Sequence, residues 1–197
     1  MKHLPRAHQR EAIQDVVGGF QSHERGQLIM ACGTGKTLTA LWVAEAMKVK
    51  LTVVFLPSIS LLLQYALSWR DNHSMADYHA LCVCSDTSLS RGSVDDLGVA
   101  SLSDSGFAVT TDSGDIECFM RGHGSRVVFC TYQSACVIAA TQTGSNVPTF
   151  DLAICDEAHR CAGDISSPFA IVLDGKRIRA DRRLFATATP KDMNARR

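Results

Sequence analysis

A glycine-rich segment at residues 30–37, with the sequence Met-Ala-Cys-Gly-Thr-Gly-Lys-Thr, contains the residue types that bind phosphate. It follows an apolar run at 27–30 and precedes a helical pattern over 38–48. This order of strand, glycine-rich loop and helix is the context that a P-loop requires. Glycines let the backbone curl so that several N–H groups point at phosphate oxygens, and the helix adds its positive dipole end. The segment therefore predicts a nucleoside-triphosphate site.

Most residues of this loop have a predicted part in binding. The residues expected to contact the nucleotide are Gly33, Thr34, Gly35, Lys36 and Thr37. Lys36 would reach the β- and γ-phosphates, and the Thr37 hydroxyl would ligate Mg²⁺. The first position of the general pattern is a glycine, and here it is Met30. A glycine-rich turn that ends in Lys-Thr by chance is the alternative, and the strand–loop–helix setting disfavours it.

Two acidic residues, Asp156 and Glu157, follow the apolar run at 151–155. Asp156 would hold Mg²⁺, mostly through water, because this small ion keeps several of its waters. Glu157 would orient and deprotonate the attacking water, which makes it and Lys36 the predicted catalytic residues. An acidic helix N-terminus is the alternative explanation for either carboxylate alone. The presence of a P-loop in the same chain favours metal-binding and catalytic roles for the two acids over this alternative.

The alternation of strands and helices determines where these residues lie. The apolar runs that predict strands are 27–30, 51–56, 79–84, 127–131, 151–155 and 182–186. The predicted helices are 5–22, 38–48, 61–69, 113–120 with a cap at Thr111-Asp112, and a stretch from 132–134 through 140. Such alternation predicts an α/β fold with a mostly parallel sheet and helices on both faces. Ligands of such sheets bind beyond the carboxyl ends of the strands, where the P-loop and the two acids would meet.

Composition limits the alternatives. The chain has 197 residues, 46% of them hydrophobic and 20% charged, with a net charge of zero, which fits one globular domain over 1–197. A Ser-, Asp- and Gly-rich stretch at about 85–110 predicts a loop-rich insertion. Neither a membrane-spanning run nor a signal peptide is evident. A neutral chain also has no global basic field to attract nucleic acid, so any such surface must be local.

The cysteines predict a reduced, cytoplasmic protein. Of the eight cysteines, Cys82 and Cys84 form a C-x-C pair, but no C-x-x-C pair occurs. Cys32, Cys130 and Cys155 lie in strand-like apolar runs, where a free thiol behaves as a small hydrophobic group. Structural zinc or disulfides are therefore disfavoured.

Gln9 lies early in the predicted helix at 5–22. Its amide can both accept from and donate to an adenine edge, so Gln9 could select ATP over GTP. A glutamine near the start of a helix is also commonly just solvated, and the sequence leaves both explanations open.

Six short segments together resemble the first RecA-like domain of a superfamily-two helicase or translocase of the DEAD/DEAH type. They are Arg-Ala-His-Gln at 6–9, the P-loop, Pro57-Ser58, Thr-Tyr-Gln-Ser at 131–134, Asp-Glu-Ala-His at 156–159 and Thr-Ala-Thr-Pro at 187–190. They occur in helicase order and cover nearly the entire chain. Their wording is most similar to motors of restriction and phage-defence enzymes, namely the Type III and single-chain Type I-like restriction helicases.

The resemblance implies ATP hydrolysis coupled to movement along DNA, with ATP and Mg²⁺ as cofactors. The residues that would touch the sugar-phosphate backbone are Ser58, Thr131, Tyr132, Gln133 and Ser134. For Ser58 and Thr131, capping of the following helix is an equally good explanation. His159 could link the nucleotide state to the hydroxyl-rich segment that contains Thr187 and Thr189.

The resemblance also implies partners. We expect a second RecA-like domain, which brings arginines to the γ-phosphate in this family and has no counterpart in these 197 residues. Nuclease or methyltransferase modules are expected beside it in a parent protein. Little hydrolysis is then expected from this part alone. A nucleotide-gated binding module without turnover, the first domain of an RNA helicase and a small-molecule P-loop kinase are the alternatives, the last disfavoured by the Asp-Glu-Ala-His and Thr-Ala-Thr segments.

Overall fold

The computed structural model describes residues 2–85, 102–144, 146–158 and 168–188, and the structural statements below concern these residues. Its strands are β1 (Arg25–Ile29), β2 (Leu51–Leu56), β3 (Tyr78–Val83), β4 (Ala108–Val109), β5 (Ser125–Thr131), β6 (Phe150–Asp156) and β7 (Ala180–Thr187). Its helices are α1 (Ala7–Gly19), α2 (Lys36–Ala46), α3 (Ile59–Asn72), α5 (Ser113–Arg121) and α6 (Ala135–Thr141), with 3₁₀ turns η2 (Tyr132–Ser134) and η4 (Pro168–Leu173).

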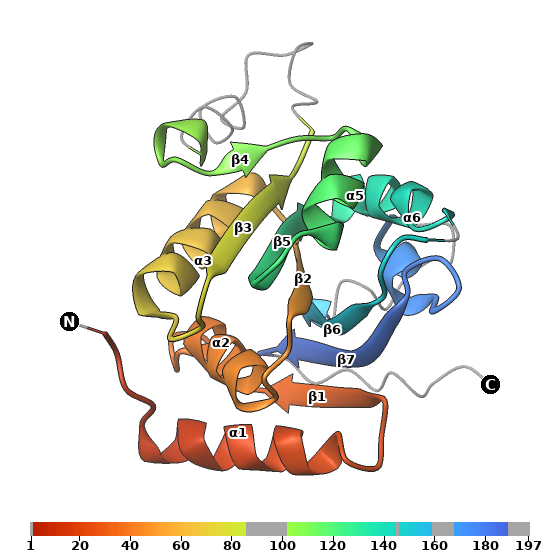
Figure 1. Ribbon diagram of the computed structural model, residues 1–197. Coiled ribbons are helices and arrows are strands. Elements are labelled where there is room, and N and C mark those ends of the chain that lie inside the picture. Colours follow the sequence, from red (N-terminus) through yellow and green to blue (C-terminus); the bar gives the residue numbers. More distant parts are fainter. Residues whose placement is uncertain (1, 86–101, 145, 159–167, 189–197) are drawn as a thin grey trace.

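The strands form one sheet in the order β1-β7-β6-β2-β5-β3-β4, and every pairing in it is parallel. In Figure 1 the sheet runs from β1 at the bottom to β4 at the top. This confirms the predicted α/β fold with a parallel sheet. Because all strands point the same way, their carboxyl ends share one edge of the sheet, where ligands bind in such folds.

Burial along the strands follows their place in the sheet. All six residues of the central strand β2 are buried, whereas the edge strand β1 buries only Leu28. A strand covered on both faces needs apolar side chains in both directions, which the Leu-Thr-Val-Val-Phe-Leu sequence of β2 supplies. This continuous apolar run is why β2 has the bounds that the sequence predicts.

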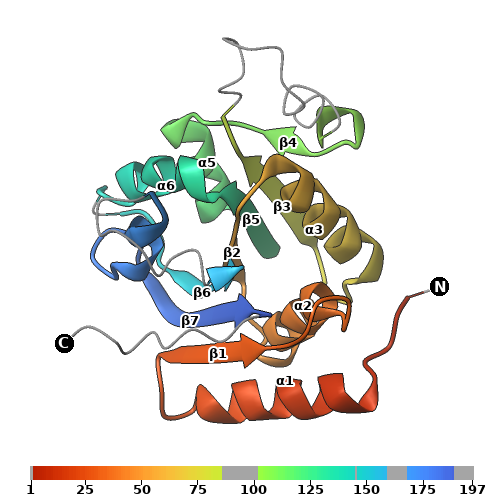
Figure 2. The ribbon, with the colours of Figure 1, turned by 180° about the vertical axis from the view of Figure 1, so that it is seen from behind.

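The helices cover both faces of the sheet because the chain reverses its direction across it. From β1 the chain moves outward to β2, β3 and β4, and then returns through β5, β6 and β7. Crossovers between parallel strands are right-handed, so a reversal of direction moves the helices to the other face. One core accordingly packs under α1, α2 and α3, and the other under α5, α6 and η4. Figure 2 shows this arrangement from behind.

Side-chain caps fix the starts of two helices. The Ser58 hydroxyl accepts a hydrogen bond from the N–H of Leu61 at the start of α3. The predicted cap Asp112 accepts from the N–H groups of Gly114 and Asp115 at the start of α5. Such caps satisfy backbone donors that a helix leaves free. In both places they set where the chain turns from a strand edge into a helix.

The region predicted to be a loop-rich insertion contains an unanticipated edge strand. Ala108 and Val109 form β4 beside β3, and the neighbouring side chains of Leu102 and Phe107 are buried in the core. Residues 86–101 lie outside the described part of the chain. Within the described ranges, each helix is either too short or too polar to cross a bilayer.

Candidate functional site

The loop between β1 and α2 has the geometry that phosphate binding requires. Gly33 and Gly35 both adopt left-handed backbone conformations, with φ of 77° and 88°, which residues with a Cβ rarely adopt. Gly35 immediately precedes α2 and has no side chain with which to cap it. The first N–H groups of α2 lack partners within the helix and face the loop together with its positive dipole end. The backbone therefore has the conformation expected of an anion-binding concavity.

Met30 shows why the first glycine of the general pattern is unnecessary here. Its side chain is buried in the core beneath the loop, and its N–H donates to the carbonyl of Thr187 at 3.1 Å. The position thus continues the pairing of β1 with β7. Cys32, in contrast, was predicted to lie in a strand and is exposed in the loop. That prediction was wrong because the buried strand ends before Cys32, at Ile29.

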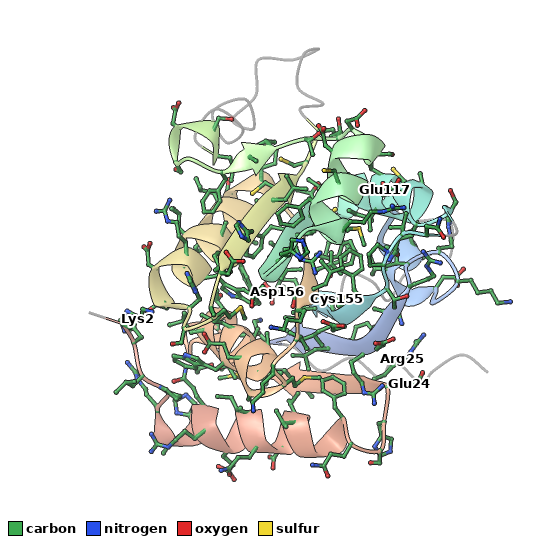
Figure 3. The ribbon with its side chains drawn as sticks, viewed as in Figure 1. Lys2, Glu24, Arg25, Glu117, Cys155 and Asp156 are labelled. Carbon is green, nitrogen blue, oxygen red and sulfur yellow. The ribbon has the colours of Figure 1, made fainter. Side chains whose placement is uncertain are left out.

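The two acidic residues lie at the carboxyl end of β6, across β7 from the P-loop strand. Asp156 is only 3% exposed, and Figure 3 shows it near the centre of the molecule. Glu157 has a φ of 51°, an uncommon conformation for a residue with a side chain, and strain of this kind concentrates at functional sites. The strand therefore ends in a turn at Glu157.

Lys36 joins the loop to these acids. Its Nζ lies 3.1 Å from Glu157 Oε1 and 3.8 Å from Asp156 Oδ1. All three side chains are at least three-quarters buried, with 11%, 24% and 4% exposed. The structure thus brings together the two predicted catalytic residues and the predicted metal ligand. An incoming phosphate would compete with these carboxylates for the lysine.

The electrostatics of Asp156 fit a cation ligand. Burial raises the pKa of its carboxyl above the ordinary value, and the Glu157 charge raises it further, while Lys36 lowers it. Its Oδ1 is buried and has no hydrogen-bond partner among the described residues. An oxygen in this position gains most from a divalent cation, which would neutralise the buried charge and satisfy its lone pairs. Asp156 and Thr37 are the residues that would hold Mg²⁺.

Gln9 is buried against the P-loop and not merely solvated. Its Nε2 donates to the carbonyls of Thr34 and Gly35 at 3.2 and 3.4 Å, and its Oε1 accepts from the Arg6 N–H at 2.8 Å. A Cβ at Gly35 would come within 2.4 Å of that amide nitrogen. The glutamine therefore supports the shape of the loop, and adenine recognition by Gln9 stays a prediction.

Buried aromatic residues make hydrogen bonds to the backbone at the start of α2 and at the end of β6. The Trp69 indole Nε1 donates to the carbonyl of Thr37 at 3.1 Å, and the Tyr132 hydroxyl donates to the carbonyl of Asp156 at 2.8 Å. A third, Tyr65, is buried with its hydroxyl near Thr37 and Asp156. None of these three contacts is predicted from the sequence. The available signal was the spacing of Tyr65 and Trp69 by four positions, which places two polar-tipped aromatic side chains on one buried face of a helix.

The predicted nucleic-acid contacts fall into two groups. Gln133 is exposed and Ser58 is half-buried, whereas Thr131, Tyr132 and Ser134 are buried, with 4%, 0% and 2% exposed. The Thr131 hydroxyl donates to the Ser134 hydroxyl at 3.2 Å and does not cap η2. Capping is thus the observed contact of Ser58 but not of Thr131. Contact of any of the five with nucleic acid stays a prediction.

Of the predicted coupling residues, Thr187 is described. It is 7% exposed at the end of β7, next to β1 and the start of the P-loop. His159 and Thr189 lie outside the described residues.

Arg182 and Arg183 lie at the opposite edge of the sheet from the P-loop. Both are near the start of β7, where Arg183 pairs with Arg25, labelled in Figure 3. Arg182 donates to the carbonyl of Phe20 at 3.1 Å. Arg183 is 6% exposed and donates to the carbonyls of three residues, Val172, Ile178 and Ala180. Their guanidinium groups stabilise the fold and do not face the site.

Comparison with known proteins places this geometry in context. The model of a family described as "Type III restriction enzyme, res subunit" matches residues 2–192. A probable helicase of African swine fever virus is 29% identical over 187 residues, which cover 94% of this chain and 19% of the viral protein.

Two solved structures are also similar. The Type ISP restriction-modification enzyme LlaBIII bound to DNA has a TM-score of 0.79 and 31% identity, over 97% of this chain and 13% of that one. A nuclease-deletion mutant of the Type ISP enzyme LlaGI, in complex with a DNA substrate mimic, has a TM-score of 0.75 and 34% identity, over 96% and 18%. The chain thus spans less than a fifth of these relatives, and its fold is the RecA-like one that the sequence predicts.

We expect Asp156→Asn to stabilise the nucleotide-free chain at neutral pH. Because the folded-state pKa of Asp156 is raised, the folded state binds this proton more tightly than the unfolded state. Wild-type stability attributable to Asp156 is therefore present below the unfolded pKa of about 3.9 and is lost as pH rises through the folded pKa. Urea unfolding at pH 4 to 7 should show a gain for the variant at pH 7 that narrows toward pH 4.

The other end of the same strand offers a control with the opposite sign. Asp151 accepts hydrogen bonds from the N–H groups of Lys50 and Leu51 at 2.6 and 2.9 Å. Asp151→Ala should therefore lower stability, by about 1–3 kcal/mol. Equal or lower stability of Asp156→Asn at pH 7 would show that the carboxylate stabilises the fold instead of serving a ligand.

Proposed function

Because the chain belongs to the family of Type III restriction enzyme res subunits, we propose that it is the ATP-binding half of an ATP-dependent motor that moves along DNA. The observation that carries this proposal is the contact of Lys36 with Glu157 and Asp156. It unites a phosphate-binding loop with two acids at the carboxyl edge of one parallel sheet. A phosphate-binding cation beside a metal ligand and a candidate general base is the set that phosphoryl transfer requires.

The proposed ground state is Mg·ATP on the P-loop. The N–H groups at the start of α2 would cradle the phosphates, with Lys36 released from the acids to contact the terminal ones. Thr37 and Asp156 would hold Mg²⁺, which when bound supplies positive charge to the phosphate oxygens. Support comes from the left-handed Gly33 and Gly35 and from the unsatisfied Asp156 Oδ1.

Glu157 would accept the proton of the attacking water. The two acids would divide the work, with Asp156 holding the metal and Glu157 the water. Glu157 is paired with Lys36 at 3.1 Å. Binding of phosphate to the lysine would therefore free the base at the moment when the substrate arrives.

Nucleic acid would bind beyond the ends of β2 and β5. Both solved relatives are DNA complexes, which supports DNA over RNA as the track. Ser58 and Gln133 are the accessible members of the two predicted backbone-contact segments. Contacts to phosphates suit a motor because phosphates repeat at every nucleotide and carry no sequence information. Coupling through His159, Thr187 and Thr189 belongs to the same proposal.

Productive hydrolysis would need a second RecA-like domain. Arg182 and Arg183 are bound to main-chain carbonyls at the far edge of the sheet, so neither can place positive charge on the γ-phosphate. An arginine from a second lobe would supply it, as the family resemblance implies. Nuclease or methyltransferase modules in a parent protein and a cytoplasmic location complete the proposal.

Lys36→Ala tests the P-loop. Loss of a charge-assisted contact to phosphate should weaken ATP binding by about 10- to 100-fold. The variant should still fold, with reduced thermal stability because Asp156 and Glu157 lose their counter-charge. Calorimetric titration with ATP, beside the exposed-lysine control Lys176→Ala, measures the effect. Unchanged affinity in Lys36→Ala would refute the proposed nucleotide site.

Gln9→Ala tests base recognition. If the Gln9 amide reads adenine, the chain should bind ATP more tightly than GTP, and the variant should lose most of that preference. Gln14→Ala, an exposed glutamine of the same helix, should keep it. Equal affinities of the wild-type chain for ATP and GTP would restrict Gln9 to its observed contacts with the P-loop.

The 197-residue chain alone should hydrolyse ATP slowly, with or without DNA. Without an arginine on the γ-phosphate, phosphoryl transfer loses on the order of 10³–10⁵ in rate. A second RecA-like domain supplied in trans should restore part of the rate, and Glu157→Gln should abolish what is restored. Steady-state phosphate release measures both. Brisk, DNA-stimulated turnover by the isolated chain would instead mean that one of its own arginines acts, with Arg160 the first to test.

A further inference from the structure

Tyr65 lies in the middle of α3, and its hydroxyl has no assigned function. The residue is 2% exposed, and the hydroxyl has no partner that meets hydrogen-bond geometry within the described part of the chain. A buried hydroxyl in that condition destabilises the fold relative to a satisfied one. The apolar ring alone would fill the same space without this cost. The hydroxyl therefore calls for an explanation.

The hydroxyl is next to the two residues that would hold Mg²⁺. It is close enough to interact with the Asp156 carboxylate and with the Thr37 side chain. One helical turn further along α3, the Trp69 indole is bonded to the Thr37 carbonyl at 3.1 Å. Trp69 itself is fully buried and packs edge-on against Phe129. The helix is thus fixed against the start of α2, and the position of Tyr65 is fixed with it.

The neighbouring carboxylate is incomplete in the same way. Asp156 Oδ1 is buried without a hydrogen-bond partner, 3.8 Å from Lys36 Nζ. A buried donor and a buried acceptor are therefore near enough to interact, but neither meets hydrogen-bond geometry with a described partner. A small shift of the carboxylate, or a metal-bound water between the two groups, would satisfy both. Entry of Mg²⁺ with the nucleotide provides the cause for such a shift, because the cation draws a carboxylate oxygen toward itself.

We propose that Tyr65 is a positioning residue for the metal: its hydroxyl donates to the Asp156 carboxylate, or to a water on the ion, and fixes the oxygen that faces Mg²⁺. This inference depends on the proposed function, since it concerns the same nucleotide site. Removal of a group that hydrogen-bonds to a metal-binding side chain typically lowers metal affinity by about 10- to 100-fold. Tyr65 therefore acts on the metal and not directly on the phosphates, which Lys36 and the loop contact.

The test is the Mg²⁺ dependence of ADP binding to the full chain, with Tyr65→Phe as the variant. ADP affinity is measured by calorimetry in EDTA and at increasing Mg²⁺. Tyr65→Phe should need about tenfold more Mg²⁺ than the wild type to reach its full ADP affinity. In EDTA, both should bind ADP equally. Thermal unfolding without nucleotide should give an equal or higher Tm for the variant, because an unsatisfied hydroxyl has been removed.

Tyr78→Phe is the matched control. The Tyr78 hydroxyl is also buried and without a partner among the described residues, but Tyr78 belongs to β3 and its ring stacks on His73. Its removal should leave the Mg²⁺ dependence unchanged. If Tyr65→Phe follows the wild-type Mg²⁺ curve, or loses equal affinity in EDTA, the inference is wrong while the proposed function stands. If the wild-type chain binds no ADP under any condition, both are wrong.

Discussion

The ion cluster formed by Lys36, Asp156 and Glu157 is the interaction on which the rest of the site depends. It places one positive and two negative side chains in a largely buried position, with Nζ–oxygen distances of 3.1 and 3.8 Å. Buried charges are costly unless they are paired, and here one lysine serves two carboxylates. A divalent cation beside Asp156 would add positive charge to this cluster. A site of this kind gives up stability of the ligand-free protein for affinity toward its ligand.

The fold supplies the rigidity that such a cluster needs. Lys36 is the first residue of α2, after the loop that follows β1, whereas Asp156 and Glu157 lie at the end of β6. In the sheet, β7 separates β1 from β6. Behind them, Trp69 is bonded to the Thr37 carbonyl and Tyr132 to the Asp156 carbonyl. Both bonds are made to main-chain carbonyls. They therefore fix the backbone at Thr37 and Asp156 and do not occupy the side chains of these two residues. The rings of Trp69 and Tyr132 are fully buried in a close-packed core, which restricts their movement and keeps the two hydrogen bonds in place.

The sequence predicts the parts of this molecule that depend on local pattern. Strands such as β2 are recognised because both faces are buried, and the P-loop because its glycines adopt conformations that other residues rarely adopt. Asp156 and Glu157 are recognised because two consecutive carboxylates directly follow a buried apolar strand. In contrast, β4 has only two residues, too few to show the alternation of apolar and polar side chains that predicts a strand. It is a strand because it pairs with β3.

Contacts between distant segments were not predictable. Gln9 contacts Thr34 and Gly35 because α1 packs on the loop, and the Tyr132 hydroxyl, from η2 after β5, donates to the Asp156 carbonyl at the end of β6. This last bond has a thermodynamic consequence. If nucleic acid binds as we propose and displaces η2, the main chain of Asp156 moves with it, and the two proposed binding events would then share one free-energy term. Linkage makes that term reciprocal: each ligand must change the affinity of the other by the same factor. In this proposal the Tyr132 hydroxyl would couple nucleotide binding to the affinity for nucleic acid.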